Sequence, residues 1–283
     1  MPRVVRLLVA SAADPASVTQ RDVLLNIAAW KDAGEFAGGL AHRHGDDLLV
    51  TIPDLHLYHD HLDREVGTVL GEKPDLVVFL SKHRSESGTP SLTVHPLGNV
   101  GPAAFGGRPG TLVPAAPRAM TETLRAVRRE AEGLPYAVTF EATHHGPLLE
   151  TPAFFIEAGS TEKEWREVRA AEALMRALLT VEPRASPIAV GVGGGHYVPR
   201  LTDVALSRDV AFGHLLAGHA LPFLTDAMID EVVARTPGAS LVYVHRKAVE
   251  KPILRDLEAR FMARGLRSVH EDDLAALPPK QSY

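Results

Sequence analysis

The segment that decides the fold reads Asp75-Leu76-Val77-Val78-Phe79-Leu80, directly after Pro74. Its run of apolar residues leaves no polar face for water, which is typical of a strand that a parallel sheet buries on both faces. Outward from this strand, strand-like and helix-like patterns alternate. Further strands are expected at residues 3–10, 48–52, 91–95, 137–143, 153–156, 188–192, 240–244 and 266–269, and helices at 15–30, 118–133, 161–180, 225–235 and 249–264.

This alternation predicts an α/β fold with a mostly parallel sheet covered on both faces. No internal repeat and no linker divides the 283 residues, so we expect a single α/β domain over residues 1–283. Two stretches, near 53–74 and 98–117, have weak patterns or many glycines and prolines, and we expect irregular insertions there.

Composition narrows the classes of function. With 45% hydrophobic and 23% charged residues, the chain is an ordinary globular protein, and a net charge of −5 argues mildly against non-specific coating of nucleic acid. No cysteine is present, so disulfides, thiolate nucleophiles and cysteine zinc sites are excluded, and any metal must use His, Asp or Glu. The sequence contains no run of about 18 apolar residues, so no membrane span is expected. We expect a cytoplasmic protein, with no membrane contact and no protein partner predicted.

A polar loop, residues 81–90, follows the apolar strand and contains Lys82, His83 and Arg84. In open α/β sheets, ligands bind beyond the carboxyl ends of the strands, so this loop is a candidate site. For His83, as for His95 after the next strand, a structural histidine with satisfied hydrogen bonds is about as plausible as a metal ligand.

A second candidate is the His144-His145 pair at the end of the strand predicted at 137–143. Alternate side chains of a strand point to opposite faces, so both histidines reach one site only where the strand ends, near Gly146-Pro147. Glu141 adds a carboxylate, and Glu-x-x-His-His joins the two residue types that a divalent metal site needs. The alternative is a hydrogen-bonded histidine pair that fixes a turn.

The glycine-rich stretch Gly191-Val192-Gly193-Gly194-Gly195-His196 matches neither the dinucleotide fingerprint nor the phosphate loop. Its glycines could let the backbone approach a ligand, with N–H groups free to hold an oxyanion or phosphate, or they could form a flexible turn. His214 and His219 lie five residues apart, about 140° around a regular helix, so we expect at most one of them in a site.

Together, these segments resemble the D-aminoacyl-tRNA deacylase family of the archaeal and plant type. The resemblance is carried by Phe79-Leu80-Ser81-Lys82-His83-Arg84-Ser85-Glu86-Ser87-Gly88-Thr89-Pro90, Thr93-Val94-His95-Pro96, Glu141-Ala142-Thr143-His144-His145-Gly146-Pro147, Gly193-Gly194-Gly195-His196-Tyr197, Gly213-His214 and Gly218-His219. It implies a zinc-dependent hydrolase, on a fold like those of peptidyl-tRNA hydrolases and phosphorylases, that cleaves the ester between a D-amino acid and tRNA. The absence of cysteine and of a Gly-x-Ser-x-Gly motif favours activated water as the nucleophile.

The hypothesis assigns three groups of residues. Catalytic roles fall to Glu141 (general base or supporting partner), His145 and His83; the zinc ligands are sought among His144, His145, His196, His214 and His95; and the tRNA or its terminal phosphate is bound by Lys82, Arg84, Gly193, Gly194, Gly195 and Arg200. The arginines of the 118–133 helix could extend this basic surface. The alternatives are a phosphorylase-like enzyme acting on nucleoside and phosphate, and a non-catalytic RNA-binding protein.

Overall fold

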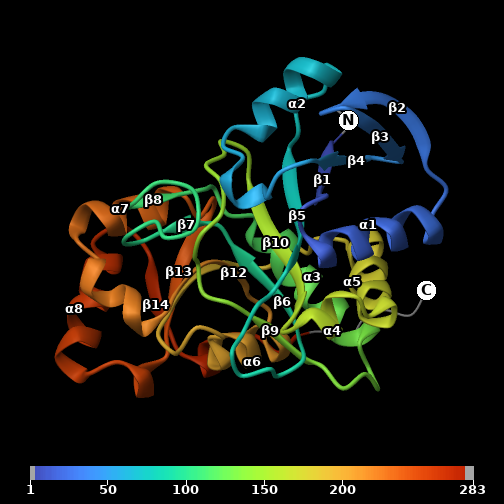
Figure 1. Cartoon of the computed structure of the whole chain (residues 1–283). Coiled ribbons are helices and arrows are strands. Elements are labelled where there is room, and N and C mark those ends of the chain that lie inside the picture. The colour runs from blue at the N-terminus through green and yellow to red at the C-terminus, as the bar shows by residue number, and fades with distance from the viewer. Residues whose placement is uncertain (1–3, 278–283) are drawn as a thin grey trace.

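A computed structural model describes residues 4–277 (Figure 1). Its larger sheet has the strand order β2-β3-β4-β1-β5-β10-β6-β9. The neighbours β4, β1, β5 and β10 are parallel, β6 runs antiparallel to β10, and the β2–β3 hairpin closes one edge. These strands are β1 (Arg6–Ser11), β2 (Lys31–Phe36), β3 (Gly39–His44), β4 (Asp47–Ile52), β5 (Leu76–Lys82), β6 (Ser91–Pro96), β9 (Ala137–Phe140) and β10 (Ala153–Gly159).

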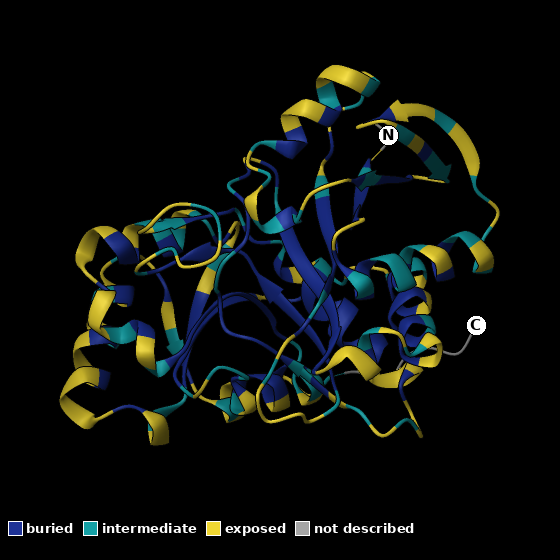
Figure 2. Ribbon diagram, viewed as in Figure 1, coloured by how far each residue is buried: buried dark blue, intermediate teal, exposed yellow. Residues whose placement is uncertain are grey.

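The central strands of the larger sheet are buried on both faces, as the apolar run in β5 predicts, whereas most residues of the β2–β3 hairpin are exposed or half-buried. Val78 and Leu80 pack toward α1 (Pro15–Ile27), α3 (Pro117–Glu130) and α5 (Val168–Thr180), whereas Val77 and Phe79 pack toward α2 (Leu62–Leu70). Asp14 caps α1 by accepting hydrogen bonds from the N–H groups of residues 16 and 17, and Pro15 occupies the first helical turn, as expected. In Figure 2 the centre of this sheet is buried throughout.

A second sheet of four parallel strands lies beside the first, in the order β12-β11-β13-β14. Its strands are β11 (Ile188–Val192), β12 (Ala211–Leu216), β13 (Ala239–Val244) and β14 (Arg267–Val269). Val190 and Val242 face α7 (Asp226–Ala234) and α8 (Lys251–Met262), and Phe212 faces α3 and α6 (Pro199–Ser207). The expected α/β fold, mostly parallel and covered on both faces, is therefore confirmed.

Three local predictions need correction. The insertion near 53–74 is not wholly irregular, because it holds a 3-10 turn, η1 (His56–Tyr58), and α2, whose short amphipathic pattern is hidden among polar residues. The strand β12 was not expected, since its glycine and histidine conceal an otherwise apolar run. The helix expected at 161–180 is two helices, α4 (Glu162–Trp165) and α5. The stretch 98–117 is largely irregular as expected, with a short hairpin of β7 (Gly98–Asn99) and β8 (Thr111–Leu112).

Helix α3 does not present all its arginines to solvent. The Arg125 side chain is buried, pairs with Glu122, and donates hydrogen bonds to the carbonyl oxygens of Ala205 and Val210. It therefore joins α3 to α6 and β12 and is unavailable to a nucleic acid. Arg128 and Arg129 at the end of α3 are exposed. Within residues 4–277, no helix has the length and apolar character needed to cross a membrane.

Candidate active site

Two buried carboxylates, Glu141 and Glu157, lie at the centre of the candidate site. Their side chains are 0% and 2% exposed, and burying two such groups is costly unless cations or donors surround them. Five histidines surround the two carboxylates: His83, His95, His144, His145 and His196 approach one another or a carboxylate. They come from β6 and from three loops. Segments far apart in the sequence thus build one cluster.

The register of the larger sheet explains why Glu157 belongs to this cluster. In β10, Phe155 lies opposite His95 of β6, and Glu157 lies two residues further on, so all three side chains share one face. The His95 ring stacks on Phe155, with ring centroids 5.0 Å apart, and its Nε2 lies 3.7 Å from Glu157 Oε1. An apolar strand thereby carries a carboxylate into the interior.

His83 links the two carboxylates beyond the end of β5. Its Nδ1 lies 2.9 Å from Glu141 Oε1 and 3.6 Å from Glu157 Oε2, while its Nε2 lies 2.8 Å from the Tyr197 hydroxyl. Burial lowers the pKa of His83, but hydrogen bonding to Glu141 and Glu157 and their charges outweigh burial and raise this pKa to about 11. A protonated His83 offers no lone pair to a metal, so its charge neutralises and positions the carboxylates.

The stability of the metal-free protein should therefore fall in alkali. The folded-state pKa of His83 lies above its ordinary value of 6.5, so its contribution is complete below about pH 6.5 and is lost as pH rises toward 11. We expect urea unfolding to give a free energy about 3 kcal/mol lower at pH 9 than at pH 6.5. His83→Gln should flatten this decline, whereas the exposed-residue control His219→Gln should retain it. If the free energy of unfolding of His83→Gln still fell by the parental amount between pH 6.5 and pH 9, the raised pKa could not be assigned to His83.

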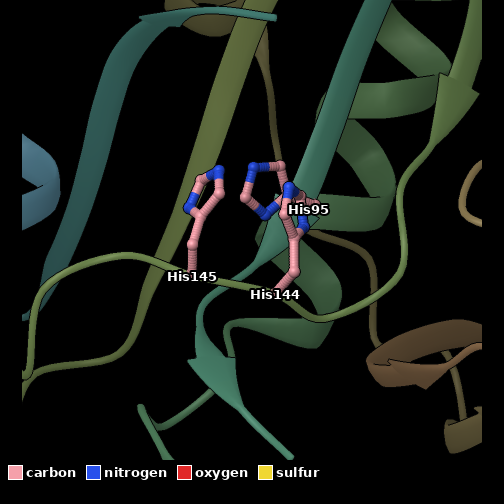
Figure 3. Close-up of side chains that lie close together, drawn as sticks. All are labelled: His95, His144 and His145. Atoms are coloured by element: carbon pink, nitrogen blue, oxygen red, sulfur yellow. The ribbon is translucent and has the colours of Figure 1, made fainter. Parts of the chain in front are cut away.

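His144 and His145 stand on the loop after β9, which ends earlier than expected, at Phe140. His145 adopts a left-handed backbone (φ 34°), a conformation that costs about 1–3 kcal/mol in a non-glycine residue. A hydrogen bond from the Gly98 N–H to the His145 carbonyl oxygen (2.8 Å) holds this conformation. As a result the two rings lie on the same side, with centroids 3.9 Å apart, and Figure 3 shows them gathered with His95.

Both of these histidines are neutral. Burial, reinforced by the charge of His95, lowers the pKa of His144 to about 3. Burial likewise holds the pKa of His145 well below its usual range, with a further contribution from His144. The His144 Nδ1–H donates to the Ala142 carbonyl oxygen (2.8 Å), so the lone pair is on Nε2, 3.5 Å from Glu141 Oε2.

The glycine-rich loop after β11 delivers the fifth histidine. Gly193 and Gly194 have φ angles of 98° and 102°, which other residues rarely adopt, and they turn the chain so that His196 reaches the cluster. His196 Nε2 lies 2.8 Å from Glu141 Oε2. The His196 side chain is 39% exposed, the most open of the five, so the site meets solvent here.

The donor set suits a divalent cation. The Nδ1–H of His95 donates to the Pro96 carbonyl oxygen (3.1 Å), so its Nε2 faces Glu157 with a lone pair when the ring is neutral and with a proton when the ring is charged. His144 directs its Nε2 lone pair at Glu141. A lone pair facing a carboxylate is repelled unless a proton or metal ion lies between them. Burial lowers the pKa of His95, but the hydrogen bond to Glu157 and the charge of Glu157 outweigh burial and raise it, so a positive charge is favoured between these two groups.

Within residues 4–277, three groups of possible ligands satisfy this requirement, with ligand atoms within 4.8 Å of one another. They are His95, His144 and His145; His95, Glu141 and Glu157; and His83, Glu141 and His196. His145 Nδ1 and His95 Nε2 are buried without a hydrogen-bond partner among residues 4–277. The charged state of His83 makes the third group the least suitable for a metal.

Several of the residues singled out in the sequence lie elsewhere. His214 is fully buried, and its two ring nitrogens contact the Thr143 hydroxyl (3.1 Å) and the Val113 carbonyl oxygen (3.1 Å), so it is outside the cluster and we exclude it from the proposed ligands. His219 is exposed on η2 (Gly218–Phe223). Lys82 places its ammonium 5.4 Å from the centroid of the Trp165 ring.

The two arginines predicted to bind tRNA, Arg84 and Arg200, lie in different environments. Arg84 is exposed on the loop after β5, beside His83 in sequence. Arg200, in the first turn of α6, forms an ion pair with Glu271 and lines a pocket of about 450 Å³ together with His245 and Lys247. Its charge is thus partly neutralised within the protein.

The sequence analysis missed two residues of the candidate site, Glu157 and Tyr197. Glu157 follows Phe154-Phe155-Ile156 directly, and a charged residue inside such an apolar strand is the signal that could have revealed it. Tyr197, which follows His196, was quoted only as part of a motif, and its contact with His83 spans 114 residues of sequence. No local pattern indicates such a contact.

Comparison with known proteins gives a consistent result. A family model described as D-aminoacyl-tRNA deacylase matches residues 70–269. A D-aminoacyl-tRNA deacylase of Thermoplasma acidophilum is 39% identical over 85% of this chain and 90% of its own length. One from Methanococcoides burtonii is 35% identical over 96% of this chain, which spans 57% of that relative. A crystal structure of a conserved protein of unknown function matches with a TM-score of 0.89 and 29% identity, over 96% of both chains.

Proposed function

Because the chain belongs to the D-aminoacyl-tRNA deacylase family, we propose that it is an ester hydrolase that releases free D-amino acid and tRNA from D-aminoacyl-tRNA. The observation that carries this proposal is the pair of buried carboxylates, Glu141 and Glu157, within a cluster of five histidines. We further propose that residues 1–283 act as one catalytic domain and work in the cytoplasm, where aminoacyl-tRNA is made and used.

Zinc is the metal that fits this donor set best. Neutral imidazoles with buried carboxylates suit zinc, whereas magnesium prefers oxygen ligands and retained waters. His95, His144 and His145 would hold the ion, with Glu141 and Glu157 as further ligands or as partners that orient the imidazoles. When bound, zinc supplies Lewis-acid chemistry that allows water to lose a proton near neutral pH.

The proposed reaction needs a proton acceptor and a proton donor. Water attacks the ester carbonyl carbon and gives up a proton, the carbon–oxygen bond to the ribose then breaks, and the ribose oxygen leaves with a proton. His196 is suited to carry the proton, because it is the most open histidine of the cluster and its Nε2–H points at Glu141 Oε2. Its other ring nitrogen is then the basic atom.

The direction of the pKa shift decides the role of Glu141. Burial raises its pKa, but the hydrogen bonds to His196 and His83 and the neighbouring histidine charges outweigh burial and hold it well below the usual range. Such a carboxylate is a weak general base at neutral pH. Of the two roles considered from sequence, we therefore favour that of a partner that orients His196 and His144. His83 and His145 then act as a positioning residue and a ligand, respectively.

The substrate contacts are expected from the glycine-rich loop and from three cationic side chains. The Gly193 N–H donates to the Leu216 carbonyl oxygen (2.7 Å), so it is not free for a substrate. We retain Gly194 and Gly195, next to His196, as the backbone donors suited to the developing oxyanion or to a terminal phosphate. Lys82, Arg84 and Arg200 surround the ends of β5 and β11, and we retain them as contacts for the tRNA backbone.

The decisive experiment follows the release of amino acid from tRNA charged with D-tyrosine or with L-tyrosine. We expect multiple turnovers with the D-ester and a much slower reaction with the L-ester. A zinc-loaded protein that leaves the D-ester intact would contradict the proposed function. Phosphate-dependent cleavage of a nucleoside would instead support the phosphorylase-like alternative.

A further inference from the structure

Three exposed aromatic side chains gather around one loop near the cluster. Tyr58, Phe105 and Phe223 are 60%, 58% and 44% exposed, and within residues 4–277 they are the aromatic members of the large hydrophobic residues left open to solvent. They belong to η1, to the β7–β8 connection and to η2, respectively. Large apolar side chains seldom stay exposed together without a function.

The β7–β8 connection brings these three segments together. A Cβ atom at Gly106 (φ 75°) would lie 1.7 Å from the carbonyl oxygen of Leu57, so the loop presses against the residue before Tyr58. A Cβ atom at Gly101 would lie 2.9 Å from the Phe223 ring, so this ring packs against the same loop. In Figure 1 the β7–β8 hairpin lies between the segment before α2 and helix α7.

The same loop is attached to the histidine cluster. The Gly98 N–H donates to the carbonyl oxygen of His145 (2.8 Å), and the Gly146 N–H donates to that of Phe105 (3.2 Å). These bonds hold the His145–Gly146 peptide between two points of the loop. The position of Phe105 is therefore fixed relative to the site where the ester would be cleaved.

A cation accompanies the aromatic rings. Arg108, three residues after Phe105, is exposed, and no ion pair with it occurs within residues 4–277. By contrast, Arg64 pairs with Glu150 and Arg200 pairs with Glu271. Exposed aromatic rings together with an unpaired cation are the combination that single-stranded nucleic acids bind: bases stack on the rings and phosphates contact the cation.

We propose that Tyr58, Phe105 and Phe223 form a stacking surface for the unpaired nucleotides at the 3′ end of the tRNA, with Arg108 contacting a phosphate. This inference rests on the proposed function, because the ester is attached to those nucleotides and must reach His144 and His145. A second copy of this chain is a less suitable occupant, because the loop that carries Phe105 is hydrogen-bonded to the His145–Gly146 peptide, next to the place where the ester must enter.

The test measures KM and kcat with tRNA charged with D-tyrosine. Phe105→Ala, Tyr58→Ala and Phe223→Ala should each raise KM about 5- to 100-fold, with kcat within about 2-fold of the parent. Phe105→Trp should keep the parental KM, and Phe105→Leu, which is apolar but cannot stack, should not. Met262→Ala, at an exposed position on α8, is the matched control and should change nothing. Parental KM values in all three alanine variants would overturn the proposal.

Binding of uncharged tRNA separates this inference from the proposed function. The parent should bind intact tRNA more tightly than tRNA trimmed of its unpaired 3′ nucleotides, and Phe105→Ala should remove that difference even if no ester is ever cleaved. An undiminished preference in all three variants would sink the stacking surface. The proposal would also be overturned if sedimentation showed that the parent is a dimer, that the variants are monomers, and that tRNA binding is unchanged. The rings would then form a self-association surface.

Discussion

Removal of bound metal with a chelator is expected to lower the rate of D-aminoacyl-tRNA hydrolysis by about 10³-fold, and added zinc should restore it. The physical reason lies in the directions of the imidazole lone pairs. His95 and His144 are fixed through Nδ1, so their Nε2 lone pairs are aimed at Glu157 and Glu141, an arrangement that requires a cation. Without it, protons take its place, and the raised pKa of His95 records this substitution.

Two further measurements make the metal prediction specific. Zinc should raise the Tm of the metal-free protein, since a ligand that binds the folded state stabilises it, whereas magnesium should restore neither Tm nor rate. His145→Ala should lower zinc content and activity together, while the control His219→Ala, on exposed η2, should retain both. Full turnover in protein shown by elemental analysis to lack metal would exclude a metal-dependent reaction.

The fold could be predicted where apolar pattern and burial coincide. The run in β5 predicted a doubly buried parallel strand, and the strand β11 was recognised in the same way. The failures occur where tertiary packing overrides local pattern. His214 and Gly213 made β12 look polar, yet the interior accepts the histidine because the Thr143 hydroxyl and the Val113 carbonyl oxygen form hydrogen bonds with its two ring nitrogens.

The candidate site was predictable in part, because its histidines are rare residues in unusual contexts. Sequence also indicated that His144 and His145 could share a site only past the end of their strand, and the left-handed conformation at His145 is how the chain achieves this. The sequence could not show which residues of different strands lie side by side in the sheet. Glu157 is adjacent to His95 only through the antiparallel pairing of β10 with β6, and strand pairing cannot be read from either strand alone.

Glu157→Gln is expected to lower zinc affinity by about 10- to 100-fold and to reduce turnover at least as much, although glutamine has almost the same shape. Burial raises the pKa of Glu157, but the hydrogen bonds to His83 and His95 outweigh burial and lower it to about 2, so the carboxylate is fully charged at neutral pH. Removing that charge leaves Glu141 as the only carboxylate beside His83 and replaces the charged oxygen that faces His95 Nε2 with a neutral amide.

The Glu157 prediction has a readout that a purely structural role would not produce. The pKa of His83, measured by NMR in the metal-free protein, should fall from its raised value of about 11 in Glu157→Gln, because one of the two charges that sustain it is gone. Glu157→Asp should keep that pKa raised while weakening zinc binding, since the charge persists on a shorter side chain. The exposed control Glu130→Gln should alter neither property. If Glu157→Gln retained both the parental turnover and the raised pKa of His83, the carboxylate would have no part in the cluster's electrostatics, and the ligand set would reduce to the histidines with Glu141.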